Sequence, residues 1–350
     1  MKAVNFGKRI FAALLILLFV FSLSFSLVSC EEDSSPEVNN RVFYEYFDTV
    51  SVLYDYSGME SEEFSALAKS VEAAIAHYHR LFDIYHEYEG LTNLATLNRL
   101  AGTGKVKASA EIIELLSFCR DMYDLTGGKV NVAMGSVLSL WHDFRVSGGK
   151  GGVPSAEELS ARAEHTSIDS VIIDEENLTV EITDPELMLD VGAIAKGYTA
   201  ELIKAELKRQ GYSGLVLDMG GNLCAIGRKP SGEGWKSGIR NPLYFDGDEK
   251  PYTRTVTLLD GSLVTSGVYE RYHTVDGIRY HHIIDPASLR PENRYLSVSV
   301  QTSHSGVADA LSTAIFNMSE EEAEAFVSAL ENTEVTLIFA DGSYKVLKSE

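Results

Sequence analysis

Residues 214–230, GLVLDMGGNLCAIGRKP, decide which fold class the sequence favours. The apolar run that contains Asp218 stops at Gly220-Gly221, and a second apolar run starts at Leu223. This is the pattern of a strand, a glycine turn and a second strand. Two strands joined directly by a turn are not the strand–helix–strand unit of which a doubly wound sheet is built.

The segments on either side mix strands and helices in no regular order. Alternating or apolar runs predict a strand pair at 41–56, strands at 170–174, 178–183, 187–190, 235–240, 254–259, 262–267, 278–284 and 294–302, and a closing hairpin at 334–347. Helical spacing predicts helices at 61–86, for which Ser61 is the expected N-cap, and at 109–126, 193–210, 305–317 and 319–331. A glycine-rich surface loop is expected at 147–155. The sequence therefore predicts an α+β fold with mixed, largely antiparallel sheets flanked by helices.

The N-terminus carries a different kind of signal. Lys2, Lys8 and Arg9 precede an apolar run from Ile10 to Val28, and Leu27-Val28-Ser29-Cys30 follows the pattern of a bacterial lipobox. We expect residues 1–29 to be a lipoprotein signal peptide, Cys30 to be acylated and residues 30–40 to be a tether. An uncleaved membrane anchor is the alternative, because the apolar run approaches spanning length. Residues 41–350 would then form an exported domain that is lipid-anchored to a bacterial membrane.

The charge of the chain restricts its partners. With 30 Lys and Arg against 51 Asp and Glu, the net charge is −21, and loss of the basic leader would make it more negative. Such an acidic chain argues against nucleic acid as a partner. A phosphate-bearing ligand would need local help from a metal, a helix N-terminus or a few basic residues. Cys119 and Cys224 lie in apolar patterns and are expected in the core.

The segment LDVGAIAKGYTAELI, residues 189–203, contains a possible anion site. A predicted strand ends at Asp190, Gly192 permits a tight turn, and a helix is expected to begin near Ala193. Unpaired amides at such a helix start suit a phosphate group. Lys196 in the first turn is placed unfavourably for the helix dipole, which suggests that it contacts a ligand. An ordinary strand–turn–helix remains the alternative.

The segment HSGVADALSTAIF, residues 304–316, predicts a helix with one polar face. Asp309, Ser312 and Thr313 are spaced i, i+3 and i+4 and therefore lie on the same side. A carboxylate with hydroxyl groups suits Mg²⁺, which prefers oxygen ligands. A solvated polar helix face is the alternative.

The segment RYHHIIDPASLRP, residues 279–291, places two histidines at the end of a predicted strand. On a strand His281 and His282 point to opposite faces, so they would not grip one metal together. Pro286 ends the strand, so Asp285 lies at the end of the strand. One histidine beside this Asp suits a general base or a phosphate contact. Arg271, in VTSGVYERYH, is by itself an ordinary surface arginine of a hairpin.

Five blocks occur together and in order: LDVGAIAKGYTAE, LDMGGN, VTSGVYERY, HHIIDP and ADALSTA. The set resembles the ApbE family of FAD:protein FMN transferases over about residues 41–345. The resemblance implies a flavin transferase fold, with FAD as donor and Mg²⁺ at its pyrophosphate. It also implies that a Thr or Ser hydroxyl of an exported flavoprotein attacks the FMN-side phosphorus and that AMP leaves.

The resemblance also assigns roles to single positions. It implies metal ligands at Asp309 and Thr313, with Ser312 beside them and the carbonyl of Ala193. His282 is the implied base, and His281 is the better candidate for a structural residue. The implied FAD contacts are Phe47, Tyr85, Lys129, Val130, Asn131, Asp190, Lys196 and Ile283 or Ile284. The chain departs from the family at Asn131-Val132-Ala133 and at Leu289, which replaces a glycine that could take a positive φ freely.

Other functions stay open on the sequence. The same site could hydrolyse FAD to FMN and AMP if water replaced the acceptor hydroxyl. A lipoprotein that binds FAD without chemistry is a second alternative, and a solute-binding lipoprotein is a weaker third.

Overall fold

The computed structural model describes residues 38–245 and 250–349, and the predicted signal peptide, Cys30 and most of the predicted tether lie outside them. The described residues belong to one compact unit that starts at Val38. Within these residues, no helix has both the length and the apolar character that crossing a bilayer requires.

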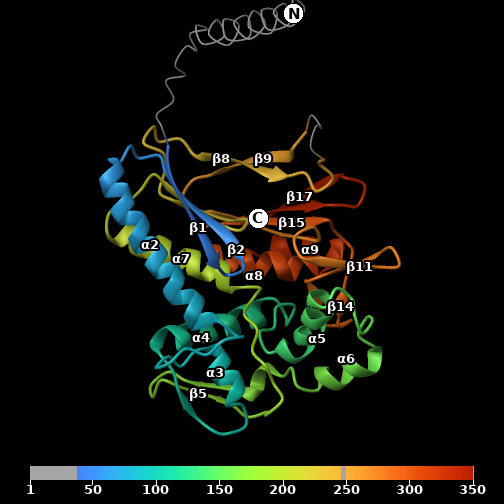
Figure 1. Ribbon diagram of the computed structural model, residues 1–350. Helices are drawn as coiled ribbons and strands as arrows, with labels where there is room; N and C mark the ends of the chain where they lie inside the picture. Colours follow the sequence, from blue (N-terminus) through green and yellow to red (C-terminus); the bar gives the residue numbers. More distant parts are fainter. Residues whose placement is uncertain (1–37, 246–249, 350) are drawn as a thin grey trace, which may run out of the picture. The chain divides into compact units, whose positions relative to one another are not determined.

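An antiparallel sheet forms the centre of the fold (Figure 1). Its strands, in spatial order, are β1 (Asn39–Tyr46), β2 (Thr49–Asp55), β6 (Leu215–Met219), β7 (Asn222–Ile226), β10 (Ser262–Gly267), β15 (Ser297–Thr302), β16 (Glu334–Ile338) and β17 (Tyr344–Lys348). The hairpin predicted at 214–230 is β6–β7. Its turn requires Gly220, because a Cβ at this residue, whose φ is +62°, would lie 2.0 Å from Thr49 Oγ1.

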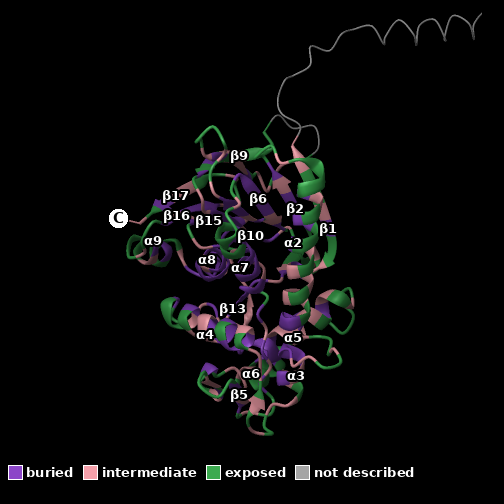
Figure 2. Ribbon diagram, turned by 90° about the vertical axis from the view of Figure 1, so that its left-hand side faces the viewer, coloured by how far each residue is buried: buried purple, intermediate pink, exposed green. Residues whose placement is uncertain are grey.

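Both faces of this sheet are covered. Leu215 and Leu217 of β6 pack into a core with helices α2 (Ser61–Phe82) and α7 (Ala195–Arg209). Val216, which points to the opposite face, packs against the ribbon of β8 (Trp235–Arg240) and β9 (Tyr252–Leu258). Helix α8 (Ser305–Phe316) lies beside α7 on the first face (Figures 1 and 2). Burial on both faces explains why the strand reads as a continuous apolar run.

A second lobe is inserted between β2 and β6 and lies below the sheet in Figures 1 and 2. It contains α3 (Leu94–Arg99), β3 (Val106–Lys107), α4 (Ala110–Leu125), α5 (Gly135–Val146), α6 (Ala156–Ala163), a 3₁₀ turn (Ile168–Ser170), β4 (Val171–Asp174) and β5 (Thr179–Ile182). The largest core cluster joins this lobe to the sheet, since it contains Ile112 of α4 as well as Leu311 of α8.

Shorter elements complete the described chain between β10 and the C-terminus. They are β11 (Tyr272–Val275), β12 (Ile278–His281), β13 (Ile284–Asp285), β14 (Arg290–Pro291) and α9 (Glu320–Ser328). The predicted α+β class, with largely antiparallel sheets flanked by helices, is confirmed.

Three predictions about single elements were wrong. Helix α2 is preceded by Glu60 rather than capped by Ser61, and it ends at Phe82 rather than residue 86 because Asp83 turns the chain. Residues 187–190 form no strand, and only Met188 makes a bridge, to Met134. The strand predicted at 278–284 is broken after His281. The Ile283 amide donates to the ring of His281 and not to a neighbouring strand.

Candidate functional site

The polar face predicted for residues 304–316 exists on α8. Asp309 and Ser312 are buried and Thr313 is partly buried. The Ser312 hydroxyl lies 2.8 Å from Ser266 Oγ of β10, and the Thr313 hydroxyl lies 3.5 Å from the same atom. The helix therefore directs these two hydroxyl groups toward β10.

The start of α7 reaches Asp309 from the other side. The Gly197 amide and the Asn222 side-chain amide each donate to Asp309 Oδ2 at 2.8 Å, and Lys196 Nζ lies 3.7 Å from this oxygen. A Cβ at Gly197 would lie 2.4 Å from the Ser305 carbonyl, so only glycine permits the two helices to come this close. Gly197 and Asn222 were not predicted as site residues, although a glycine inside a helical pattern is a signal of close packing.

Helix α7 begins at Ala195, two residues later than predicted, which leaves Ala193 in the preceding turn. The amide four residues on, Gly197 N, would ordinarily bond to the Ala193 carbonyl but donates to Asp309 instead. The Asp309 carboxylate, the hydroxyls of Ser312 and Thr313 and the Ala193 carbonyl are all hard oxygen donors, and such donors fit Mg²⁺. Among the residues that the structure describes, no group of three or more His, Cys, Asp and Glu side chains is arranged to hold a metal ion, and the set on α8 contains a single carboxylate.

The two adjacent histidines have different surroundings. His281 is fully buried, with Nε2 3.0 Å from the Glu292 carbonyl and Nδ1 accepting the Ile283 amide at 3.2 Å. His282 is only partly buried, and its Nδ1 lies 3.3 Å from the Arg271 carbonyl. If this nitrogen carries the proton and donates to the carbonyl, Nε2 holds the free lone pair.

The protonation state of His282 follows from its neighbours. Burial among the surrounding atoms, together with the positive charges of Arg271, Arg145 and Lys196 and with His281, lowers the pKa of His282 to about 3. The imidazole is therefore neutral near pH 7 and able to accept a proton. Lys196, one of these charges, also lies 3.7 Å from the Asp309 carboxylate.

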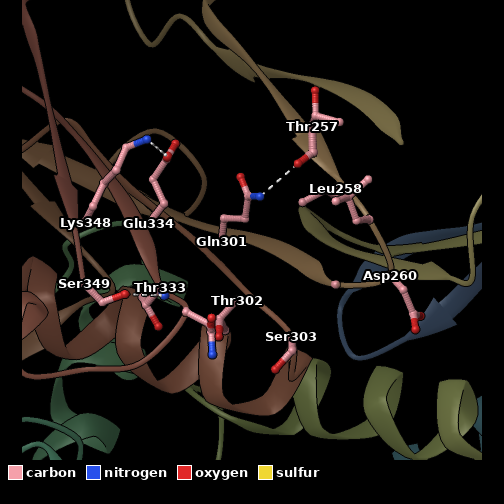
Figure 3. A pocket seen from close by; sticks show the side chains of 13 residues that line it. Thr257, Leu258, Asp260, Gln301, Thr302, Ser303, Thr333, Glu334, Lys348 and Ser349 are labelled. Carbon is pink, nitrogen blue, oxygen red and sulfur yellow. Dashed lines mark hydrogen bonds and ion pairs between the residues drawn. The ribbon is translucent and has the colours of Figure 1, made fainter. Parts of the chain in front are cut away.

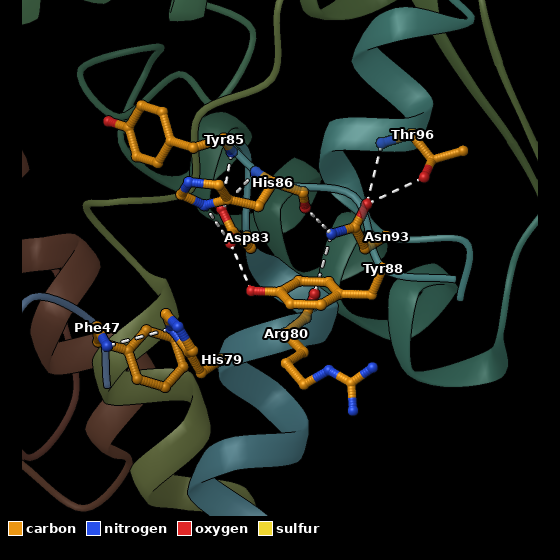
Figure 4. Close-up of polar contacts among 9 residues, drawn as sticks. All are labelled: Phe47, His79, Arg80, Asp83, Tyr85, His86, Tyr88, Asn93 and Thr96. Carbon is orange, nitrogen blue, oxygen red and sulfur yellow. Dashed lines mark hydrogen bonds and ion pairs between the residues drawn. The ribbon is translucent and has the colours of Figure 1, made fainter. Parts of the chain in front are cut away.

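The predicted flavin-side aromatic, Tyr85, sits on a loop after α2 that is held by Asp83. Figure 4 shows the hydrogen bonds that Asp83 accepts: the Tyr85 amide at 2.7 Å, the Tyr88 hydroxyl at 2.8 Å and the His86 amide at 3.2 Å. Burial raises the pKa of Asp83, but these hydrogen bonds outweigh burial and lower its pKa below the usual value. The loop leaves the Tyr85 side chain 56% exposed, with its hydroxyl 3.4 Å from His142 Nδ1.

Phe47 lies in the two-residue turn between β1 and β2. Phe47 and Asp48 have φ values of 52° and 50°, as a type I′ turn requires. The Phe47 amide donates to His79 Nδ1 at 3.2 Å (Figure 4), and Arg271 donates to the Asp48 carbonyl at 3.2 Å. Arg271 therefore contacts both the Phe47–Asp48 turn, through its side chain, and the candidate base His282, through its carbonyl.

Asp190 is held next to the loop of residues 129–134. Its amide donates to the Val132 carbonyl at 2.8 Å, and its Oδ1 accepts the Gly192 amide at 2.8 Å. Burial raises the pKa of Asp190, and the charges of Arg145 and Arg271 act in the opposite direction. The same two arginines act on the pKa of His282.

The other predicted FAD contacts point into the protein. Lys129 Nζ donates to the Asn317 carbonyl at 3.0 Å, and the Asn131 amide donates to the Thr166 carbonyl at 2.9 Å. Three further side chains are buried in core clusters, namely Val130, Ile283 and Ile284. Any contact of residues 129–131 with a ligand would therefore involve mainly their backbone.

Leu289 has a positive φ, the conformation that the glycine expected at this position from the family would adopt without strain. Its φ is +58°, and its carbonyl accepts the Trp141 indole N–H at 2.9 Å. The loop after Asp285 thus has the backbone shape of a glycine turn, at a strain of about 1–2 kcal/mol.

A separate hollow lies on another part of the molecule (Figure 3). This cavity of about 570 Å³ is lined by residues of β9, β15, β16 and the C-terminal end, such as Thr257, Gln301 and Lys348. Its charged groups are paired with each other or with neighbours, as in the contact of Lys348 with Glu334 at 2.8 Å. None of the predicted site residues lines it.

Comparisons with known proteins show the family to which the chain belongs. A profile of the ApbE family matches residues 48–337. A protein of Klebsiella pneumoniae (strain 342) named FAD:protein FMN transferase is 31% identical over 251 residues, which are 69% of this chain and 76% of that protein. A protein of the same name from Treponema pallidum (strain Nichols) is 32% identical over 262 residues, 71% of each chain.

A solved structure shows the same fold. The crystal structure of the ApbE protein from Thermotoga maritima MSB8 has a TM-score of 0.77 at 25% identity, covering 90% of this chain and 97% of that one. The family profile spans most of the chain, and it includes all five motifs on which the resemblance was based. The chain belongs to the ApbE family.

Proposed function

We propose that this protein transfers FMN from FAD to a Thr or Ser hydroxyl of an acceptor protein and releases AMP. The observation that carries the proposal is that the segment with His282 packs on helix α8, since the His281 ring lies against Phe316 and the Asn317 side chain donates to the Ile284 carbonyl. Two groups of residues are thereby held on neighbouring elements. The oxygen donors of α8 and Lys196 form one group, and the neutral His282 with Arg271 and Phe47 forms the other. The Klebsiella and Treponema relatives are named FAD:protein FMN transferase, which supports FMN transfer from FAD to a protein.

A divalent cation completes the proposal. Asp309, Ser312, Thr313 and the Ala193 carbonyl would hold Mg²⁺, which when bound would offset negative charge on the diphosphate of FAD. The chain's own Lys196 adds a positive charge beside the same carboxylate.

The remaining residues position the donor and move a proton. The acceptor hydroxyl oxygen forms a bond to the FMN-side phosphorus, and the bond from this phosphorus to the bridging oxygen breaks. AMP leaves with the bridging oxygen, and the hydroxyl proton passes to Nε2 of His282. Tyr85 and Phe47 would hold the flavin ring, as exposed or turn-borne aromatics suited to stacking.

The location of the protein is a further part of the proposal. The basic start, the apolar run and the Leu-Val-Ser-Cys sequence support export and acylation of Cys30. The acceptors would then be exported flavoproteins at the extracytoplasmic face of a bacterial membrane. Mass spectrometry of the lipid-modified N-terminus in the native host would test this, and a chain that starts at Met1 would contradict it.

The decisive test follows both products of the reaction. The chain from Glu31 onward is incubated with FAD, Mg²⁺ and a Thr-containing acceptor domain, and the acceptor's intact mass and released AMP are measured. We expect a mass gain of one FMN per acceptor and a matching amount of AMP. An acceptor with Thr replaced by Val is the control and should gain no mass.

Other results would replace the proposal. AMP with free FMN and an unmodified acceptor, in the presence of several different acceptors, would identify an FAD hydrolase. Bound FAD that stays intact would identify a flavin carrier.

A further inference from the structure

Arg145 carries a buried guanidinium nitrogen that the proposed reaction has not used. Its Nη1 is inaccessible to solvent and has no hydrogen-bond partner among residues 38–245 and 250–349. Buried N–H donors in native proteins almost always have a partner, and a charged one needs it most. A ligand that brings an anionic oxygen would supply that partner.

The helix that carries Arg145 is fixed at two points. At its start, the Gly135 amide donates to the Met188 carbonyl at 2.9 Å, and a Cβ at Gly135 would lie 2.5 Å from this oxygen. In its middle, the Trp141 indole donates to the Leu289 carbonyl. Helix α5 therefore holds Arg145 in place and ties it to the segment that leads to Asp190.

The surroundings of Arg145 indicate which part of a donor it would meet. One turn earlier on the same helix, His142 lies against the Tyr85 ring, with 5.2 Å between ring centres. The charge of Arg145 acts on Asp190, Tyr85 and His282, yet no ion pair of Arg145 within 4 Å is present in the described part of the chain. The guanidinium therefore belongs to the helix that contacts the flavin-side aromatic, and its charge also acts on the candidate base.

The positive charges of the site are divided between two places. Lys196 lies beside Asp309, at the oxygens proposed to hold the metal. Arg271 lies 3.5 Å from the Phe47 carbonyl, and Arg145 lies three residues after His142, whose ring contacts Tyr85. In the flavin half of FAD, the anionic oxygens are those of the FMN phosphate.

We propose that Arg145 binds the FMN-half phosphate of the donor, with Nη1 donating to a non-bridging oxygen, and so distinguishes phosphorylated flavins from riboflavin. This inference rests on FAD being the donor. Arg145 would orient the attacked phosphorus toward His282. A guanidinium suits the role because its planar donors match phosphate oxygens better than an ammonium group does.

Binding without turnover tests this assignment. Dissociation constants for riboflavin, FMN, FAD and AMP are measured by fluorescence and calorimetry, with no divalent cation and no acceptor present. The proteins are the unmodified chain, Arg145→Met, Arg145→Lys and the control Arg162→Met, which removes an exposed arginine of the neighbouring helix α6. Thermal unfolding establishes that each variant is folded.

We expect Arg145→Met to weaken FMN and FAD binding by about 10- to 100-fold and to leave riboflavin and AMP within about twofold. Arg145→Lys should fall between, and Arg162→Met should match the unmodified chain. Three results would overturn the assignment: equal weakening of riboflavin, a loss of AMP affinity, or unchanged binding of every ligand. Failure of the unmodified chain to modify an acceptor while these affinities follow the expected pattern would overturn the proposed function alone.

Discussion

Asp309 is the residue at which the polar contacts of the site meet. Its Oδ2 accepts from Gly197 and Asn222, and Lys196 lies close by. Replacing Asp309 with Ala removes the carboxylate and leaves these donors without an acceptor. We expect divalent-cation binding to be lost in calorimetry and AMP release to fall by about 100-fold or more. Unchanged AMP release in a folded Asp309→Ala protein would contradict the assignment of the metal ligands.

The adjacent histidines offer a matched pair of substitutions. His282→Ala should keep FAD affinity within a few fold, change stability by less than about 1 kcal/mol and strongly slow AMP release, because this ring is partly exposed and supplies the base. His281→Ala should instead lower the free energy of unfolding by about 2–4 kcal/mol, because it leaves the buried partners at Glu292 and Ile283 unsatisfied. Urea unfolding and AMP assays of both variants check this. A large loss of FAD binding in His282→Ala would make His282 a ligand contact.

At the scale of elements, the approach of α7 to α8 depends on one glycine. Helix propensity alone predicts that Gly197→Ala stabilises the chain by about 1 kcal/mol. The new Cβ would, however, lie 2.4 Å from the Ser305 carbonyl and 2.6 Å from Asp309 Cβ. We therefore expect a net destabilisation of about 1–3 kcal/mol in urea unfolding and weaker cation binding.

The control for that substitution lies on the exposed face of the same helix. Ala205→Gly should lower stability by about 0.5–1 kcal/mol through propensity only and leave cation binding unchanged. A stabilised Gly197→Ala protein would mean that the two helices are free to separate.

The sequence predicted those elements whose pattern is local. Helix α8 was found because Asp309, Ser312 and Thr313 repeat at helical spacing, and the β6–β7 hairpin because Gly220-Gly221 interrupts two apolar runs. The break between β12 and β13 was missed because its cause, the ring of His281, acts through a side chain. Helices α3, α5 and α6 were not predicted, and with α5 the buried guanidinium of Arg145 was missed.

The candidate site shows the same limit. Spacing alone brought together the three residues on α8, and the resemblance to a family supplied Phe47 and Tyr85. Gly197 and Asn222 touch Asp309 only because three elements far apart in the sequence meet there. Such contacts depend on tertiary packing, which a pattern within one segment does not contain. The catalytic and ligand-binding roles of all these residues stay predictions.

At the scale of the whole molecule, histidines that are buried or partly buried should make stability depend on pH. Burial lowers the pKa of His281 to about 4, of His282 to about 3, and of His304 below its usual value. Between about pH 6.5 and 5 the unfolded chain therefore binds protons that the folded chain does not. Stability is full above pH 6.5 and should fall by up to about 1.4 kcal/mol per pH unit for each histidine as the pH drops.

Urea unfolding at pH 7.5, 6.0 and 5.0 measures this slope. Asp190 and Asp218, whose pKa values burial raises, oppose the trend toward the acidic end. His281→Asn removes one titrating group. The slope of the free energy of unfolding against pH should therefore decrease by about the contribution of one histidine. A stability that is constant or that rises on acidification would show that these rings are not held neutral.

The order of strands in the central sheet also determines how the chain must fold. Asp55 of β2 pairs with Leu215 of β6, so the whole second lobe is synthesised between two neighbouring strands. Pairing of such distant segments slows folding, with expected times of milliseconds to seconds or longer. Until β6 arrives, the inner edge of β2 has no partner and can pair with another molecule. Refolding yield should therefore fall as protein concentration rises, and the chain must have left the ribosome as far as β6 before the central sheet can close.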